Sequence, residues 1–331
     1  MARFGILAAL ALGALVAAPL PGSDSAPDSD VPSRAERPAG SLVFVFRSSR
    51  LAAVDVATGR RTVRRVPALA SCGPELHVTG GHVIFGGLRR GRTIVYSAPV
   101  SLDRAPTRLG GAHAFVPSAT DGRVWLAGVD CSRREMVGVR EIGVDGEVTQ
   151  QSGRRVPGTW VEGAVEDGLV ILSRRRLAVW SPRTGDIRRL PLEGASDAHG
   201  TRLVGCALRS RCRRLLLLDT GTGANVTARP PRSYRFDYGA EFSPDGALIA
   251  APVVSGRRWG VALVDARDGT ASVVPGSRTG RIYPTLSWSA SSGRLFFLAG
   301  DGRIKAYRPG EPRARMLPFR LPRNALAFVA G

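Results

Sequence analysis

The chain has 331 residues, of which 44% are hydrophobic and 22% are charged. These proportions exclude a disordered or fibrous chain and supply enough apolar material for a core. The 40 glycines and 23 prolines indicate many short strands joined by turns. A chain of this length often holds two domains, although a repeat architecture of the same length forms one.

The chain is strongly basic, with 47 lysines and arginines against 27 acids and a net charge of +20. Lys305 is the only lysine, so the other 46 basic residues are arginines. An excess of arginine is also typical of a genome rich in G and C. The arginines are spread over nearly every predicted turn and form no stripe with interleaved aromatics, so no nucleic acid partner is predicted. An anionic surface of the cell envelope fits the charge better as a partner.

The N-terminus, residues 1–20, is predicted to be a signal peptide or an N-terminal membrane anchor. One positive charge precedes an apolar run of 17 residues from Phe4 to Leu20, which is at the low end of what spans a membrane. Cleavage after Ala18 would place Pro19 beside the cut, which signal peptidases disfavour, so both alternatives stay open. No cysteine follows the run, which excludes attachment as a lipoprotein.

Residues 21–40 carry Pro, Ser and Asp without an apolar pattern, and they are predicted to be a disordered linker. Residues 41–331 are predicted to be the folded domain. Both alternatives for the N-terminus place this domain outside the cytoplasm, either secreted or anchored to the outer face of the cytoplasmic membrane.

The stretch from Tyr238 to Val254, YGAEFSPDGALIAAPVV, is predicted to form a β-hairpin. Pro presets φ for a turn, Asp can bond the backbone two residues on, and Gly adopts positive φ. The Pro244-Asp245-Gly246 turn separates two runs of apolar and small residues, which is the pattern of a hairpin.

Degenerate copies of this hairpin recur along the chain. From Gly81 to Gly293 the turn glycine recurs in five steps over 212 residues, a mean spacing of about 42. Each unit reads as four strands, which gives six units. The turn glycines are Gly81, Gly122, Gly168, Gly200, Gly246 and Gly293.

The two ends of the domain supply a seventh unit. Leu42 to Phe46, Leu51 to Val56 and Arg61 to Val66 read as its second, third and fourth strands. The C-terminal segment from Asn324 to Gly331 (NALAFVAG) has the apolar character of the missing first strand. A closed ring needs such a strand because an open array leaves edges unpaired. The prediction is an all-β β-propeller of seven four-stranded blades, with six or eight as alternatives.

The FSPDG motif at Phe242 to Gly246, followed by a buried strand, resembles the first hairpin of a blade in TolB-type and WD-repeat-like β-propellers. Resemblance to TolB-type propellers implies a protein or cell-wall component as partner. Ser118 to Trp125 shares only part of the Asp-box turn of sialidase propellers, with Thr120 where the Asp belongs, and is interpreted as an ordinary turn.

Four cysteines lie beyond the N-terminal segment, and an even number in an exported chain favours disulfides. Cys206 and Cys212 are predicted to pair across one loop between neighbouring strands. Cys72 and Cys131 lie in loops expected on one face, where they could join neighbouring blades.

No catalytic residues, metal site or cofactor are predicted. No GxSxG motif or CxxC pair occurs, and the four histidines are dispersed and are expected to be solvated or in turns. The function predicted is a binding or interaction scaffold in the cell envelope; the alternative is an envelope hydrolase or lyase with its site at the mouth of the channel.

A binding surface is predicted at one mouth of the channel, where loops entering the first strands carry acids and aromatics. Such groups together suit a ligand or peptide site, although carboxylates in loops also simply face water beside local arginines. The predicted binding residues are Glu75, Phe115, Trp160, Glu162, Glu193, Tyr238, Glu241 and Tyr283.

Overall fold

The computed structural model describes residues 42–47, 49–68, 76–90, 92–112, 114–130, 135–154, 156–173, 176–208, 210–281, 283–289, 293–299, 302–320 and 327–330. Contacts divide the chain into two units, Met1–Arg37 and Pro38–Gly331, and the fold concerns the second. The predicted signal or anchor and nearly all of the linker lie in the first unit, outside the described residues. In the part of the chain that the structure describes, no helix is long and apolar enough to cross a membrane.

The strands of the described residues form seven antiparallel sheets, which are named below with the strands of each in order from its inner edge outward. The sheets are β29 (Ala327–Ala330), β1 (Leu42–Arg47), β2 (Arg50–Asp55) and β3 (Arg61–Arg65); β4 (Leu76–Thr79), β5 (His82–Arg89), β6 (Arg92–Pro99) and β7 (Thr107–Gly111); β8 (Ala114–Pro117), β9 (Arg123–Asp130), β10 (Glu135–Gly143) and β11 (Val148–Ser152); β12 (Trp160–Val165), β13 (Gly168–Ser173), β14 (Arg176–Trp180) and β15 (Ile187–Arg189); β16 (Leu192–His199), β17 (Arg202–Ala207), β18 (Leu215–Asp219) and β19 (Asn225–Ala228); β20 (Arg235–Phe236) with β21 (Glu241–Phe242), then β22 (Leu248–Ser255), β23 (Arg258–Asp265) and β24 (Ala271–Val273); and β25 (Leu286–Trp288), β26 (Leu295–Leu298), β27 (Arg303–Tyr307) and β28 (Arg315–Arg320).

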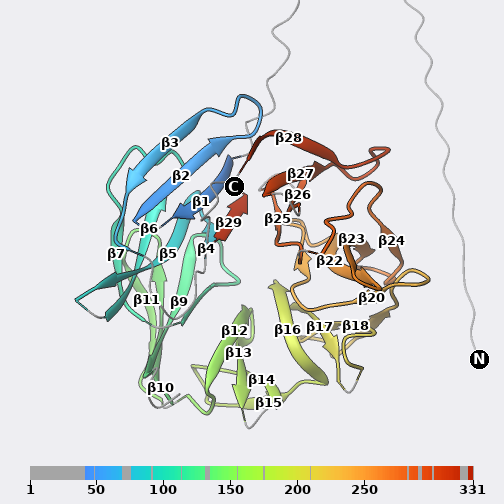
Figure 1. The fold of residues 1–331 in the computed structure, drawn as a ribbon. Coiled ribbons are helices and arrows are strands. Elements are labelled where there is room, and N and C mark those ends of the chain that lie inside the picture. The colour runs from blue at the N-terminus through green and yellow to red at the C-terminus, as the bar shows by residue number, and fades with distance from the viewer. Residues whose placement is uncertain are drawn as a thin grey trace, which may run out of the picture. The chain divides into compact units, whose positions relative to one another are not determined.

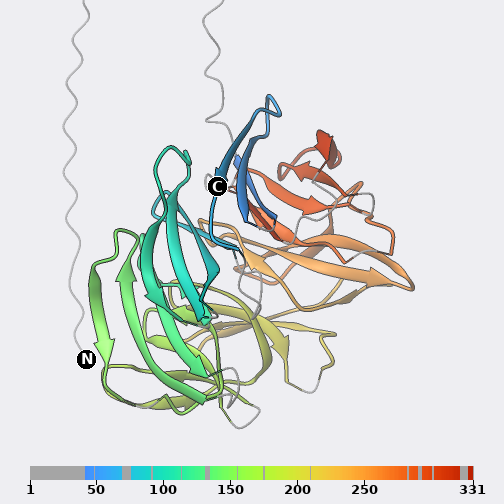
Figure 2. The same cartoon turned by 60° about the vertical axis from the view of Figure 1, so that its left-hand side comes forward.

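The innermost strand of each sheet contacts the innermost strands of the two neighbouring sheets. The contacts run in the cyclic order β29, β4, β8, β12, β16, β21, β25 and back to β29. The sheets therefore follow one another around a common centre in chain order (Figures 1 and 2). This arrangement confirms the all-β propeller predicted from the repeated hairpins.

The C-terminal strand closes this cycle. β29 pairs antiparallel with β1, with Val43 opposite Ala330 and Phe46 opposite Ala327, and Figure 1 shows the two strands side by side. The Ala330 N–H also donates to the Ser287 hydroxyl of the preceding sheet at 2.8 Å. The first sheet is thus completed by residues from both ends of the folded unit, as expected from the apolar C-terminus.

The turn between the third and fourth strands repeats from sheet to sheet. Asp265 Oδ1 accepts the Arg267 N–H at 2.7 Å, and the Asp265 carbonyl accepts the Gly269 N–H at 2.9 Å. Gly269 has a φ of 75°, which favours glycine. The same arrangement recurs at Asp55 and Asp219, where the N–H that bonds to the carbonyl again belongs to a glycine four residues later. The turn chemistry of the sequence therefore specifies where the third strand ends in these three sheets.

The apolar core lies between neighbouring sheets. One buried cluster joins Val204 and Leu217 of one sheet to Ile249 and Val264 of the next, and Phe236 is 1% exposed within it. Cys206 and Cys212 are part of this cluster and form a disulfide, as predicted. The predicted link between Cys72 and Cys131 falls outside the described residues.

Removing residues 324–331 should prevent cooperative folding of the domain, because β1 would lose its inner partner and the ring would stay open. The milder Ser287→Ala should lower the free energy of unfolding by about 1–2 kcal/mol, the cost of a buried N–H without an acceptor. Denaturant titration of the purified protein measures both effects. Ser272→Ala, at an exposed position of β24, should change nothing, and a truncated protein as stable as the full chain would contradict the closure.

Reduction of the Cys206–Cys212 disulfide should lower the free energy of unfolding by roughly 2 kcal/mol, because the loop it closes is short. Denaturant titrations with and without reductant measure this difference. The double variant Cys206→Ala, Cys212→Ala should be insensitive to reductant. An equal response of both proteins would assign the effect to other cysteines.

Candidate functional site

The inner strand of the sixth sheet is interrupted. β20 and β21 both pair with β22, but residues 237–240 between them leave the ladder. Pro252 of β22 lies opposite this gap and accepts the Asp237 N–H through its carbonyl at 3.0 Å. Because proline has no N–H to return, the inner strand cannot continue its regular pairing there.

The interrupted segment is held by side chains from both neighbouring sheets. Ser196 Oγ accepts the Gly239 N–H at 3.3 Å, and the Tyr283 hydroxyl donates to the Tyr238 carbonyl. Gly239 has a φ of 84°, and a Cβ at this position would overlap the Tyr283 hydroxyl. The Tyr283 ring in turn packs edge-on against Trp259, with ring centroids 5.0 Å apart. The segment is therefore fixed, and its side chains are presented at defined positions.

Two carboxylic acids lie on the adjacent inner strands β16 and β21. Asp197 Oδ2 accepts the Phe242 N–H at 2.7 Å. Burial raises the pKa of Asp197 to about 6, although the bond from Phe242 opposes this shift. Burial, together with the nearby Asp197 carboxylate, raises the pKa of Glu241 well above its usual range. The two groups are thus electrostatically coupled.

We refer to six side chains around this segment as the acidic–aromatic cluster. Burial raises the pKa of the Tyr238 hydroxyl, with further contributions from Glu193 and Asp237. Burial likewise raises the pKa of Tyr283, with contributions from Asp237 and Glu241. The cluster consists of Glu193, Asp197, Asp237, Tyr238, Glu241 and Tyr283.

The cluster has no arginine ion-paired to it among the described residues, in a chain of net charge +20. No arginine contributes to the raised pKa of Asp197, Glu241 or either tyrosine. Tyr238 and Tyr283 remain 45% and 39% exposed. The result is a surface with two exposed aromatic rings beside the carboxyl groups of Glu193 and Asp237, while Asp197 and Glu241 are held toward their neutral forms.

The structure brings together four of the eight predicted binding residues: Glu193, Tyr238, Glu241 and Tyr283. Two others lie in the inner strand β12, where Trp160 packs partly buried against the core. Burial raises the pKa of Glu162, the second of these. Glu162, Glu193 and Glu241 lie within the inner strands β12, β16 and β21 and not in the loops entering them, which corrects the predicted placement. Glu75 lies outside the described residues.

Phe115 is 3% exposed and belongs to the core between the second and third sheets, so it cannot line an open mouth. It packs edge-on against His77, with ring centroids 5.5 Å apart. His77 is itself half-buried, which corrects the expectation of a solvated histidine, and this burial lowers its pKa to about 4. The side chains of both residues, in β4 and β8, point into the space between the two sheets.

The sequence did not point to Ser196, Asp197 or Asp237, because strands are predicted from runs of apolar residues. Leu192 to His199 reads LEGASDAH, a polar run that resembles a loop. Its polarity was the available signal, since the inner strand of a propeller borders the channel and tolerates polar side chains. The pairing of Asp197 with Glu241 depends on contact between two sheets, which a local pattern does not show.

The cluster has the chemistry of a recognition surface more than of a metal centre. In the part of the chain that the structure describes, no group of three or more His, Cys, Asp or Glu side chains could hold a metal ion. Two coupled carboxyl groups with raised pKa could also exchange protons with a bound molecule.

No family model matches the sequence, and no curated protein matches it. Solved structures do match. TolB from Acinetobacter baumannii superposes with a TM-score of 0.51 and 12% sequence identity, over 88% of this chain and 66% of that chain. The fold is a TolB-type β-propeller.

Other proteins share this propeller. A candidate 6-phosphogluconolactonase from Bacteroides fragilis gives a TM-score of 0.52 at 11% identity, over 92% of this chain and all (100%) of that one. Hsv2 from Kluyveromyces marxianus gives 0.51 at 9% identity, over 74% and 76% of the two chains. Identities this low establish the TolB-type fold alone, and one fold hosts many functions.

The acidic pair should make the stability of this propeller fall with pH. The folded protein keeps a proton on Asp197 up to a pH of about 6, whereas the unfolded chain loses it near the usual aspartate pKa of 3.8. The free energy of unfolding should therefore fall as pH rises from about 4 to about 6, and stay lowered above that range. This rise in the pKa of Asp197 corresponds to a loss of up to about 3 kcal/mol in the free energy of unfolding.

Asp197→Asn keeps the oxygen that accepts the Phe242 N–H and removes the charge. This variant should be the more stable protein at pH 7.5 and should show a flatter pH profile in denaturant titrations. Glu147→Gln, at an exposed position, serves as the control. A profile for Asp197→Asn as steep as that of the wild type would refute the assignment.

Proposed function

We propose that this chain is an extracytoplasmic seven-bladed β-propeller that acts as a binding scaffold in the cell envelope. Seven sheets with cyclic contacts between their inner strands support the blade number. The Cys206–Cys212 disulfide supports an oxidising compartment. The apolar N-terminal run, as signal peptide or anchor, supports the location. Similarity in fold to TolB supports a protein or cell-wall component as partner.

The acidic–aromatic cluster carries the proposal for the binding surface. Its carboxylates have no cation beside them among the described residues, although the chain has an excess of arginine. An uncompensated charge beside exposed tyrosines favours a partner that supplies a lysine or arginine and an apolar surface. The partner proposed for this surface is therefore a basic segment of an envelope protein.

The proposal is tested by cross-linking tagged full-length protein in the envelope of its own host and identifying the captured proteins. One enriched protein is expected, and its capture should fall at least tenfold in Tyr283→Ala and in Glu193→Lys. The first variant removes an aromatic contact, and the second places a positive charge against the basic partner. The binding should also weaken as salt concentration rises, because exposed charges are screened.

Glu147→Lys gives the matched control for Glu193→Lys, since both carry the same change of charge at exposed positions. It should capture the partner as well as the wild type does. Equal capture by all variants would reject this surface as the binding site.

A hydrolase or lyase is the second candidate, and one observation favours it. The coupled Asp197 and Glu241 both have raised pKa values, so one could donate and the other accept a proton. In the same experiment, retention of glycan or small molecules in place of a protein would favour this candidate.

A further inference from the structure

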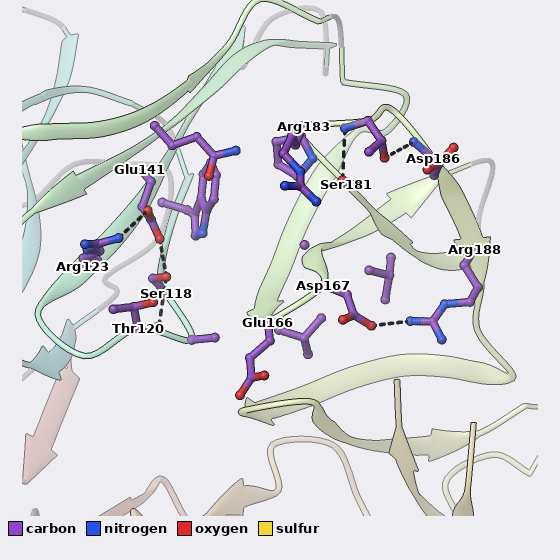
Figure 3. Close-up of a pocket in the computed structure, with 18 residues that line it drawn as sticks. Ser118, Thr120, Arg123, Glu141, Glu166, Asp167, Ser181, Arg183, Asp186 and Arg188 are labelled. Carbon is purple, nitrogen blue, oxygen red and sulfur yellow. Dashed lines mark hydrogen bonds and ion pairs between the residues drawn. The ribbon is translucent and has the colours of Figure 1, made fainter. Parts of the chain in front are cut away.

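A second candidate site lies between the third and fourth sheets, at the ends of β8 and β12. A cavity of about 720 Å³ opens there between the turn after β8, the turn before β13 and the turn after β14. Figure 3 shows its two walls, with Ser118, Arg123 and Glu141 on one side and Asp167, Ser181 and Arg188 on the other. Cavities of 300–1,000 Å³ are of the size that small ligands occupy.

The first wall is built around Glu141, which is 6% exposed. Its carboxylate accepts the Ser118 hydroxyl at 2.5 Å and the Thr149 hydroxyl at 2.8 Å. It also forms an ion pair with Arg123 at 3.4 Å. These bonds fix the turn that contains Ser118 and Thr120, so this wall is ordered before any ligand arrives.

The second wall is fixed by Arg188. Its guanidinium pairs with Asp167 at 2.9 Å and also donates to the Thr220 carbonyl. Above it, the turn from Ser181 to Asp186 is closed by the Gly185 N–H, which donates to the Ser181 carbonyl at 2.8 Å. This turn holds Arg183 over the cavity, and Figure 3 shows Arg183 reaching into the space between the walls.

Several polar groups of the lining are not used by the protein itself. The side chains of Arg183, Gln150 and Glu166 and the indole N–H of Trp125 have no hydrogen-bond partner among the described residues, and all four residues line the cavity. Arg183 and the indole are donors, Glu166 is an acceptor, and Gln150 is both. The cavity thus offers donors and acceptors together.

The charges around the cavity nearly cancel. Glu141 and Asp167 each have an arginine partner, and the remaining charged groups of the lining are Arg183, Glu166 and Asp186. In a chain of net charge +20 this balance is unusual, and it favours neither a phosphate nor a cation. The guanidinium, amide and carboxylate each carry more than one polar atom and can bridge neighbouring hydroxyls, and Trp125 supplies an apolar face.

We propose that this cavity binds a neutral saccharide. Its mixed donors and acceptors match a ring of hydroxyl groups, and its walls are ordered in advance. The proposal is independent of the acidic–aromatic cluster, which lies on other sheets and is argued to take a protein segment.

Saturation-transfer NMR on the full chain tests the proposal with maltotriose and the trimer of N-acetylglucosamine as neutral probes. Glucuronate and glucosamine serve as charged probes, and inorganic phosphate, which has no carbon-bound proton to detect, is tested by titration calorimetry. Signal transfer is expected for at least one neutral probe and for none of the charged ones. Titration calorimetry should then show that Arg183→Ala and Gln150→Ala each weaken binding about tenfold, as expected for the loss of one hydrogen bond to a ligand.

Arg267→Ala is the matched control, because Arg267 occupies the same position in the equivalent turn of another sheet, closed by the Gly269 N–H. It should bind like the wild type. The proposal would be overturned if neither neutral probe showed signal transfer, or if a charged probe bound in their place. It would also be overturned if Arg183→Ala and Gln150→Ala left the affinity for the neutral probe unchanged.

Discussion

The pairing of β29 with β1 is the constraint on which the rest of the propeller depends. Each sheet packs its apolar faces against two neighbours, so a missing neighbour leaves apolar surface and strand edges in water. The cycle of contacts between the inner strands is closed by the C-terminal strand, which completes the first sheet and contacts β25 and β4. Residues from opposite ends of the folded unit therefore set the geometry at which every inner strand, and every side chain it carries, faces its neighbours.

Within that closed cycle, the inner strands are the place where polar side chains are tolerated. Asp197 and Glu241 illustrate the cost, since both are held in their neutral forms more strongly than in water. A hydrophobic pair would pack there without this penalty. Their presence beside a segment that Pro252 forces out of the ladder supports the proposal that this region serves recognition at the expense of stability.

Local chemistry made much of the fold predictable. The Pro244-Asp245-Gly246 turn and the Asp-to-Gly turns such as Asp265 to Gly269 specify hairpins through bonds that span a few residues, and the apolar C-terminus indicated the closing strand. The candidate sites were less predictable. Tyr238 and Tyr283 were predicted because aromatics beside acids before the first strands stand out in the sequence, whereas Asp197 stayed hidden in a polar strand. Phe115 was misplaced because a pattern cannot tell which face of a short strand meets the next sheet.

The cavity and the acidic–aromatic cluster show two ways of handling charge in one basic chain. At the cavity Glu141 and Asp167 each have an arginine partner, so the walls are rigid and nearly neutral. At the cluster no arginine among the described residues pairs with the acids; Asp197 and Glu241 are held toward their neutral forms, and the charge of Glu193 and Asp237 is left for the proposed partner. Paired charges suit a ligand read by hydrogen bonds in a fixed pocket, and unpaired charges suit an electrostatically steered contact. The two proposed sites lie on different sheets, so the failure of one proposal would leave the other standing.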